Sequence, residues 1–91
     1  MPKKRDRLEV IYDILTIIRD KNNSIKPTPL LRFSNLSSQS FNEYIKELLE
    51  KEFVKEIYNK KNKKFYSLCD KGFKYLEKYE IIKGFIDEFE L

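Results

Sequence analysis

Two groups of polar side chains in this chain could bind another molecule. The first group shares one face of a predicted helix and consists of Ser38, Gln39, Asn42 and Lys46. Gln and Asn can pair with two atoms of one adenine, Ser can bond to a base or a phosphate, and Lys can reach guanine or backbone oxygens. The second group is a set of cations on a predicted hairpin tip, comprising Lys60, Lys61, Lys63 and Lys64. Because these cations repel one another, phosphates are their natural partners, and Arg32 is a further candidate.

Both groups also have a plainer explanation. A helix on a protein surface always has a polar, solvated face, and a lysine-rich loop often serves only to keep a strand edge soluble. The order of the surrounding elements decides between these explanations.

The sequence gives little support for metal binding, catalysis or membrane insertion. The chain has 91 residues, with one cysteine and no histidine, so Cys69 has no partner within the chain for a disulfide, a zinc site or a Cys/His catalytic pair, and only an intermolecular disulfide stays open to it. We therefore expect no metal, no cofactor and no enzymatic activity, and a half-buried, inert Cys69. No run of about 18 apolar residues occurs, and the N-terminus leads straight into an amphipathic pattern. We expect a cytoplasmic protein that does not enter membranes.

A first helix is predicted over about Asp6–Lys21. Its apolar stripe recurs every three or four residues, at Leu8, Ile11, Tyr12, Leu15 and Ile18. Ile14 and Ile17 widen this stripe, which indicates that another helix or another subunit also covers it.

A helix-turn-helix follows. Thr28 and Pro29 are typical of a helix start and predict a short helix over Pro29–Phe33, with Leu30, Leu31 and Phe33 buried. Asn35 suits the left-handed residue of a turn, in which Leu36 points inward. Ser37 is the expected cap of the next helix, whose apolar face consists of Phe41, Ile45, Leu48 and Leu49.

Two strands then flank the lysine-rich tip. Phe53–Tyr58 and Phe65–Leu68 are rich in strand-forming residues, and Ile25 is expected to add a short strand beside them. The predicted fold is mainly α with a small β-hairpin (α+β): a winged helix-turn-helix over residues 1–71 and a long C-terminal helix over residues 72–91, within a single structural domain.

Three short motifs carry a family resemblance: N-L-S at Asn35–Ser37, Y-I-K-E-L-L-E-K at Tyr44–Lys51, and L-C-D-K-G at Leu68–Gly72. With them the chain resembles the archaeal winged-helix DNA-binding family that includes small, dimeric, chromatin-associated proteins. The resemblance implies binding of double-stranded DNA, association with the nucleoid, and a dimer formed by an antiparallel coiled coil of C-terminal helices. Cys69 departs from the family, in which a capping Thr is usual, and should weaken the start of the last helix.

The C-terminal helix can be examined for a dimer seam independently. Tyr75, Tyr79, Ile82, Ile86 and Phe89 are spaced 4, 3, 4 and 3 residues apart, as in a heptad repeat. Either this helix folds back on its own domain or it pairs with a second chain. Phe73 and Leu76 are expected in the domain core, while Ile14 and Ile17 are candidates to extend a dimer contact.

Charge is distributed unevenly along the chain. Residues 72–91 contain 3 basic and 5 acidic side chains, against 16 and 10 in residues 1–71, so the C-terminal helix is a poor ligand for DNA. A basic run at the N-terminus either contacts phosphates or is simply solvated; it consists of Lys3, Lys4, Arg5 and Arg7.

The leading hypothesis is a homodimeric DNA-binding protein that acts as a transcriptional regulator or a chromatin-associated factor. The alternative is a protein-protein interaction module on the same scaffold. It is favoured by carboxylates on and after the third helix, namely Glu43, Glu47, Glu50, Glu52 and Glu56. Under the leading hypothesis these carboxylates should lie away from Gln39 and Asn42.

Overall fold

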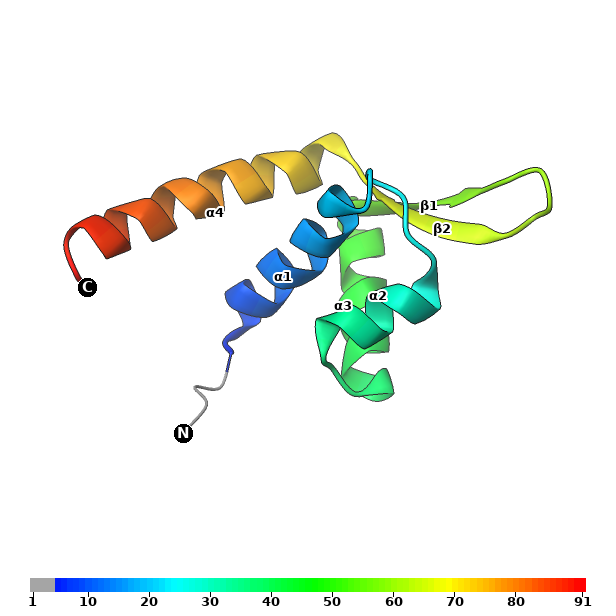
Figure 1. Ribbon diagram of the computed structural model, residues 1–91, viewed down its shortest axis with the longest axis horizontal. Helices are drawn as coiled ribbons and strands as arrows, with labels where there is room; N and C mark the ends of the chain where they lie inside the picture. Colours follow the sequence, from blue (N-terminus) through cyan, green and yellow to red (C-terminus); the bar gives the residue numbers. More distant parts are fainter. Residues whose placement is uncertain (1–4) are drawn as a thin grey trace.

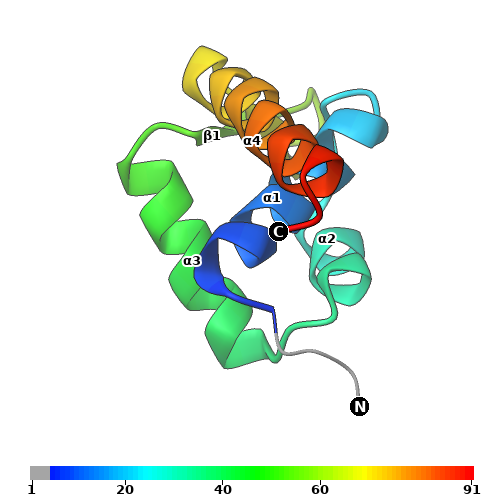
Figure 2. The same ribbon diagram turned by 90° about the vertical axis from the view of Figure 1, so that its left-hand side faces the viewer.

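Four helices and a two-stranded hairpin form residues 5–91, the part of the chain that the computed structural model describes (Figure 1). The elements are α1 (Arg7–Asp20), α2 (Pro27–Ser34), α3 (Ser38–Glu50), β1 (Val54–Tyr58), β2 (Lys64–Leu68) and α4 (Asp70–Glu88). In Figure 2, α1 lies between α2 and α3, and α4 crosses above it. The hairpin extends from one side of this helical group and α4 from the other. The arrangement confirms the predicted fold class.

The predicted helix boundaries are confirmed where a side chain caps the helix. The Asp6 carboxylate accepts a hydrogen bond from the Glu9 N–H at 2.8 Å, and α1 begins at the next residue, Arg7. The Ser37 hydroxyl accepts from the Ser40 N–H at 3.1 Å at the start of α3. Between α2 and α3, Asn35 has the expected left-handed conformation, with φ of 58°. Local sequence therefore defines the turn of the helix-turn-helix.

The predicted start of α2 was wrong by two residues. The helix begins at Pro27 rather than Pro29, and Lys26 rather than Thr28 is the capping residue, without a side-chain cap. Pro27 provides the φ that a first helical residue needs, and it forces Lys26 into an extended conformation. Pro29 is tolerated because the first N–H groups of a helix have no partner within it.

The core lies around α1, which packs against α2, α4 and β2. Its most enclosed side chains have 2% exposure or less and come from all four helices and β1; they include Ile14, Leu15, Ile18, Leu30, Leu48, Leu76 and Val54. Because Ile14 is completely buried in its own chain, its predicted role in a dimer contact was wrong. The second surface that covers α1 is supplied by the same chain.

Three apolar residues expected in the core are exposed instead. Leu8 in α1 is 55% exposed, Phe33 in α2 is 45% exposed, and Phe73 in α4 is 41% exposed. Each lies on the correct element but away from its buried line, because the elements pack through neighbouring residues such as Leu30 and Leu76. Periodicity alone does not locate the centre of a buried face to within one residue.

The hairpin is antiparallel and pairs Val54 with Leu68 at its base and Tyr58 with Lys64 near its tip. Ile25 adds the expected short strand as a single pair with Tyr66. The Ile25 N–H donates to the Tyr66 carbonyl at 3.2 Å, and the Tyr66 N–H donates to the Ile25 carbonyl at 2.8 Å. The loop before α2 is therefore fastened to β2.

The first half of α4 packs on α1 through tyrosines. The rings of Tyr12 and Tyr79 stack with centroids 4.4 Å apart, and Tyr75 lies 5.9 Å from Tyr79. The Tyr75 hydroxyl donates to the Leu8 carbonyl at 2.8 Å. At the start of the helix, a Cβ on Gly72 would lie only 2.4 Å from the Phe53 carbonyl oxygen, so this close contact requires glycine.

The packing of Tyr75 leads to a prediction about alkaline pH. Burial raises the pKa of the Tyr75 hydroxyl from its usual 10.0 to about 12. Because the folded pKa is the higher one, this packing stabilises the protein fully below pH 10 and loses its effect as the pH rises toward 12. In an absorbance titration at 295 nm, we expect Tyr75→Phe to remove the latest-titrating tyrosine. The pKa of Tyr79 is raised by burial as well, so Tyr79→Phe is the comparison variant and should leave the phase near pH 12 in place; if that phase survives Tyr75→Phe in full, the assignment is contradicted.

Candidate nucleic-acid interface

The helix α3 presents a polar face to solvent. Phe41, Ile45 and Leu48 are buried on one side of it. The four residues proposed to contact DNA are all exposed, and they are Ser38, Gln39, Asn42 and Lys46. Because α3 turns once in 3.6 residues, burial of the apolar line brings these polar side chains to the outer surface. The structure thus brings this predicted group together on one helix.

One ion pair, between Arg7 and Glu47, joins α3 to α1. Glu47 on α3 is bonded by Arg7 from α1 and, at 2.7 Å, by the ammonium group of Lys51. The hydrogen bond from Arg7 is the main cause of the lowered pKa of Glu47, with Lys51 second. Arg5 forms a salt bridge to Asp13 at 2.8 Å and donates to the Ser34 carbonyl at 2.9 Å.

The basic N-terminal run therefore divides into two parts. Arg5 and Arg7 are engaged within the protein, where they fix α1 against α2 and α3. Lys3 and Lys4 lie outside the described residues.

The carboxylates near α3 lie in different surroundings. Glu47 is paired with Arg7 and Lys51, and Glu56 lies 3.4 Å from Lys64. Glu43 is exposed and follows Gln39 by four residues, so it lies one turn further along the same side of the helix. It also borders a shallow hollow with Arg7, so it flanks the polar face on the side of α1. The expectation that all these carboxylates lie away from Gln39 was therefore wrong for Glu43.

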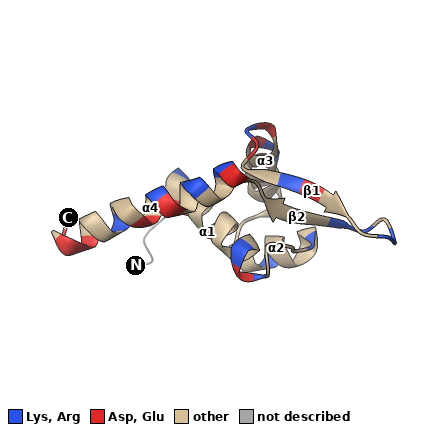
Figure 3. Ribbon diagram, turned by 90° about the horizontal axis from the view of Figure 1, so that it is seen from above, with Lys and Arg blue, Asp and Glu red and all other residues tan. Residues whose placement is uncertain are grey.

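The wing tip is an ordered loop. The Asn59 side-chain oxygen accepts hydrogen bonds from the backbone N–H groups of Lys61 and Lys63, both at 2.9 Å. Asn62 adopts a left-handed conformation that closes the loop. Lys60, Lys61 and Lys63 are exposed, and none has a salt bridge to a residue in the described part of the chain. Figure 3 shows these cations at the far end of the hairpin.

Lys64 differs from the other three lysines. It is the first residue of β2, half-buried, and its ammonium group lies 3.4 Å from Glu56 and 5.5 Å from the centre of the Tyr66 ring. The surroundings, with Tyr66 as the largest influence, raise its pKa. Of the four lysines assigned to the tip, Lys64 belongs to the strand instead.

Two positioning residues were missed in the sequence. Asn59 orders the wing tip, and its signal was an Asn at the start of a turn. Lys71 donates to the Lys51 carbonyl at 3.0 Å and so joins the start of α4 to the end of α3. No sequence pattern indicates this second contact, because the two residues are 20 positions apart.

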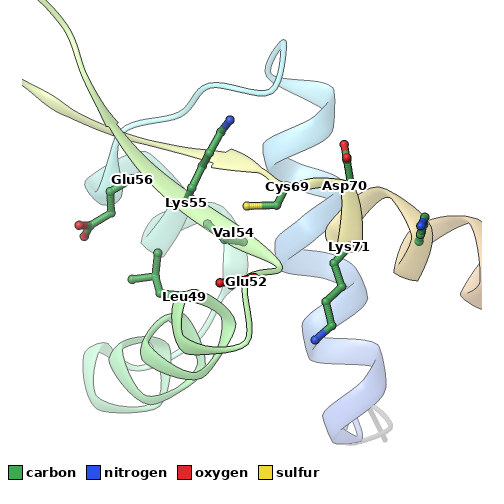
Figure 4. A pocket seen from close by; sticks show the side chains of 9 residues that line it. Leu49, Glu52, Val54, Lys55, Glu56, Cys69, Asp70 and Lys71 are labelled. Carbon is green, nitrogen blue, oxygen red and sulfur yellow. The ribbon is translucent and has the colours of Figure 1, made fainter.

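A cavity of about 870 Å³ lies between the end of α3, β1 and the start of α4 (Figure 4). The sulfur of Cys69 points into it, beside Val54 and Lys55. Both cations and carboxylates line it, so the cavity lacks the single charge sign of a phosphate site. Cys69 makes no side-chain cap on α4, as its replacement of Thr predicted.

Residues 5–91 contain no cluster of three side chains that could hold a metal ion. None of the helices described here is long and apolar enough to cross a membrane.

Comparison with known proteins places this geometry in context. An uncharacterized protein of Methanocaldococcus jannaschii, MJ0290, is 36% identical over 77 residues, which is 85% of this chain and 33% of that relative. The chain thus spans about a third of the length of the curated relative that it matches.

Two solved structures share the fold. Sso10a-2 from Sulfolobus solfataricus superposes with a TM-score of 0.74 at 16% identity, over 94% of this chain and 86% of the other. F93 from STIV superposes with a TM-score of 0.70 at 20% identity, over 91% of this chain and 92% of the other. The family model described as winged helix-turn-helix matches residues 4–86. The chain belongs to the winged helix-turn-helix family.

Proposed function

We propose that this protein binds double-stranded DNA, with α3 in the major groove and the wing on the phosphate backbone. The observation that carries the proposal is the wing tip, where Asn59 orders a loop bearing Lys60, Lys61 and Lys63. Cations that are fixed in place yet lack a salt bridge to the described residues are suited to bind an external polyanion. Sso10a-2 and F93, which share the fold, are described as DNA-binding proteins.

The roles of the two surfaces would differ. Gln39 and Asn42 are suited to read adenine, while Ser38 and Lys46 can bond to bases or phosphates. The wing lysines would contact phosphates, which positions the protein without specifying sequence. Glu43 beside Gln39 limits how closely that part of α3 approaches a phosphate, so the contact is expected along Asn42 and Lys46.

We further propose that the protein acts as a homodimer through α4. The C-terminal end of α4 extends beyond the other helices (Figure 1), and Ile82, Ile86 and Phe89 are exposed in its second half. Tyr75 and Tyr79, at the other end of the predicted seam, rest on Tyr12 of their own chain. A second copy would cover the exposed part of the seam.

Charge favours an antiparallel pair of α4 helices. An apolar hollow of about 290 Å³ at the base of α4 is bordered by Lys71, Lys74 and Lys78. The far end of the helix carries Asp87 and Glu88 beside its exposed aromatic residues. Antiparallel pairing brings the acidic end of each helix to the basic hollow of its partner. Such a dimer would hold two DNA-contacting units, which suits a transcriptional regulator or a chromatin-associated factor that binds two sites together.

Binding can be tested with the whole chain and a labelled duplex of random sequence, by fluorescence anisotropy across a salt series. We expect saturable binding whose logarithmic dependence on salt has a slope of about −0.9 for each phosphate contacted. Absence of saturable binding at low salt, or an affinity independent of salt, would contradict DNA binding and favour a role in protein-protein interaction.

A further inference from the structure

A second cationic surface lies apart from the polar face of α3 and from the wing tip. It is a groove of about 440 Å³ between the start of α2, the loop before it and β2, hereafter the α2–β2 groove. Lys21 and Lys26 border it on the loop, Phe33 on α2 and Phe65 on β2. In Figure 1 the first turn of α2 lies below the hairpin, on the side of the molecule opposite to α4. The groove is therefore on the side from which the wing extends.

Aromatic rings hold Lys21 and Lys26 at this groove and Arg32 beside it. The ammonium group of Lys21 lies 4.9 Å from the centre of the Phe33 ring, and the guanidinium carbon of Arg32 lies 5.4 Å from the same centre. The ammonium group of Lys26 lies 5.9 Å from the centre of the Phe65 ring. A ring attracts a cation without neutralising it, whereas a carboxylate would cancel the charge. Within the described part of the chain, none of the three cations has a salt bridge.

The backbone fixes the groove in place. Ile25 is paired with Tyr66 in both directions, which fastens the residue before Lys26 to β2. The Asn23 side-chain oxygen accepts a hydrogen bond from the Leu68 N–H at 2.7 Å and holds the loop to the same strand. No acidic residue occurs in the first turn of α2. Asp20 also borders the groove, but it is paired with Arg19 at 3.2 Å.

We propose that the α2–β2 groove binds a phosphodiester segment of DNA, as a third contact beside α3 and the wing tip. Lys21, Lys26 and Arg32 are the phosphate ligands, and Phe33 and Phe65 are positioning residues that keep the cations directed into the groove. Phe65 belongs to the wing strand β2 and Lys26 lies near its ring, so one DNA backbone can follow the wing into the groove. This inference rests on the proposed binding of DNA and adds Lys21, Lys26, Phe33 and Phe65 to the interface.

The test compares salt slopes of duplex binding by the whole chain. Each phosphate contact contributes about 0.9 to the slope, so K21Q/K26Q should reduce its magnitude by about 1.8, and K21Q, K26Q or R32Q alone by about 0.9. K83Q removes the same charge from an exposed position on α4, away from the groove, and is the matched control; its slope should equal that of the unmodified protein. Because these side chains are exposed, circular dichroism is expected to show an unchanged fold.

The positioning role proposed for Phe33 is tested by a separate measurement of affinity. F33L keeps all three cations but removes the ring, so affinity should fall roughly threefold to fivefold while F33Y restores it. A loss of binding that F33Y does not restore would reject the role of the ring.

The outcomes separate this inference from the proposed function. If the unmodified protein binds DNA while K21Q/K26Q and R32Q keep its salt slope, the groove is not a phosphate site but DNA binding stands. If the unmodified protein does not bind duplex DNA, both proposals fail.

Discussion

Replacing Lys60, Lys61 and Lys63 together by Gln is expected to weaken duplex binding by roughly 30- to 100-fold at about 0.05 M salt. The three ammonium groups are exposed at the wing tip, and in the described structure no carboxylate neutralises them. Each contact releases counterions from DNA, so the slope of log affinity against log salt should shrink by about 2.7. The loss should therefore diminish as salt rises, which distinguishes lost ion contacts from unfolding.

Lys64→Gln is the matched control for the wing. It removes one positive charge from the same hairpin, but Lys64 is half-buried and already paired with Glu56. We expect less than about a threefold loss of affinity, since a paired cation releases few counterions. A triple variant that is folded by circular dichroism and binds with the original salt slope would contradict the role of the wing.

Replacing Ile82 and Ile86 together by Glu is expected to convert the proposed dimer into a monomer. Both side chains are exposed in the single chain, at 58% and 39%, so the change removes little buried surface within the protomer. In a dimer it would place carboxylates in an apolar seam, which is strongly unfavourable. Light scattering at tens of micromolar should then report one chain of 11.1 kDa rather than two.

Loss of the dimer should also weaken binding to DNA that holds two sites. Two linked binding units gain about 10²-fold or more in avidity over one, and the monomer forfeits that gain. Glu77→Ala, on the opposite side of α4 from the seam, is the control and should leave both mass and affinity unchanged. An unmodified protein that is itself a monomer at these concentrations would contradict the dimer.

Much of the fold could be predicted because its signals are local. Asp6, Asn35 and Ser37 determine helix ends through contacts within a few residues, and these predictions were confirmed. The wing was predicted because strand-forming residues flank a run of Asn and Lys. The start of α2 was missed because two prolines compete for the first helical position, and sequence alone does not rank them.

The errors in burial have a different origin. The pattern placed Leu8 and Phe33 on apolar stripes, but which side of a stripe is covered depends on where the neighbouring elements cross. Ile14 shows the opposite error: it was predicted to extend a dimer contact, but it is buried within its own chain.

The candidate interface could be predicted only in part. The polar face of α3 follows from helical periodicity, and the structure exposes all four of its predicted residues. The α2–β2 groove could not be predicted, because Lys26 and Phe65 are brought together only when the loop pairs with β2. Likewise, Arg7 looked like a free cation until the fold brought it to Glu47.

The junction between β2 and α4 consists of one residue, Cys69, whose N–H donates to the Phe53 carbonyl at 3.0 Å. Such a short, hydrogen-bonded connection has little freedom to bend, so the wing and α4 are expected to move as one rigid unit. In the proposed dimer the length of α4 determines how far apart the two DNA-contacting units lie. Each residue added to or removed from α4 would change the separation by about 1.5 Å and rotate one unit by about 100° relative to the other. The length of α4 would then determine the spacing and the helical phase of the two DNA sites that both units can occupy together.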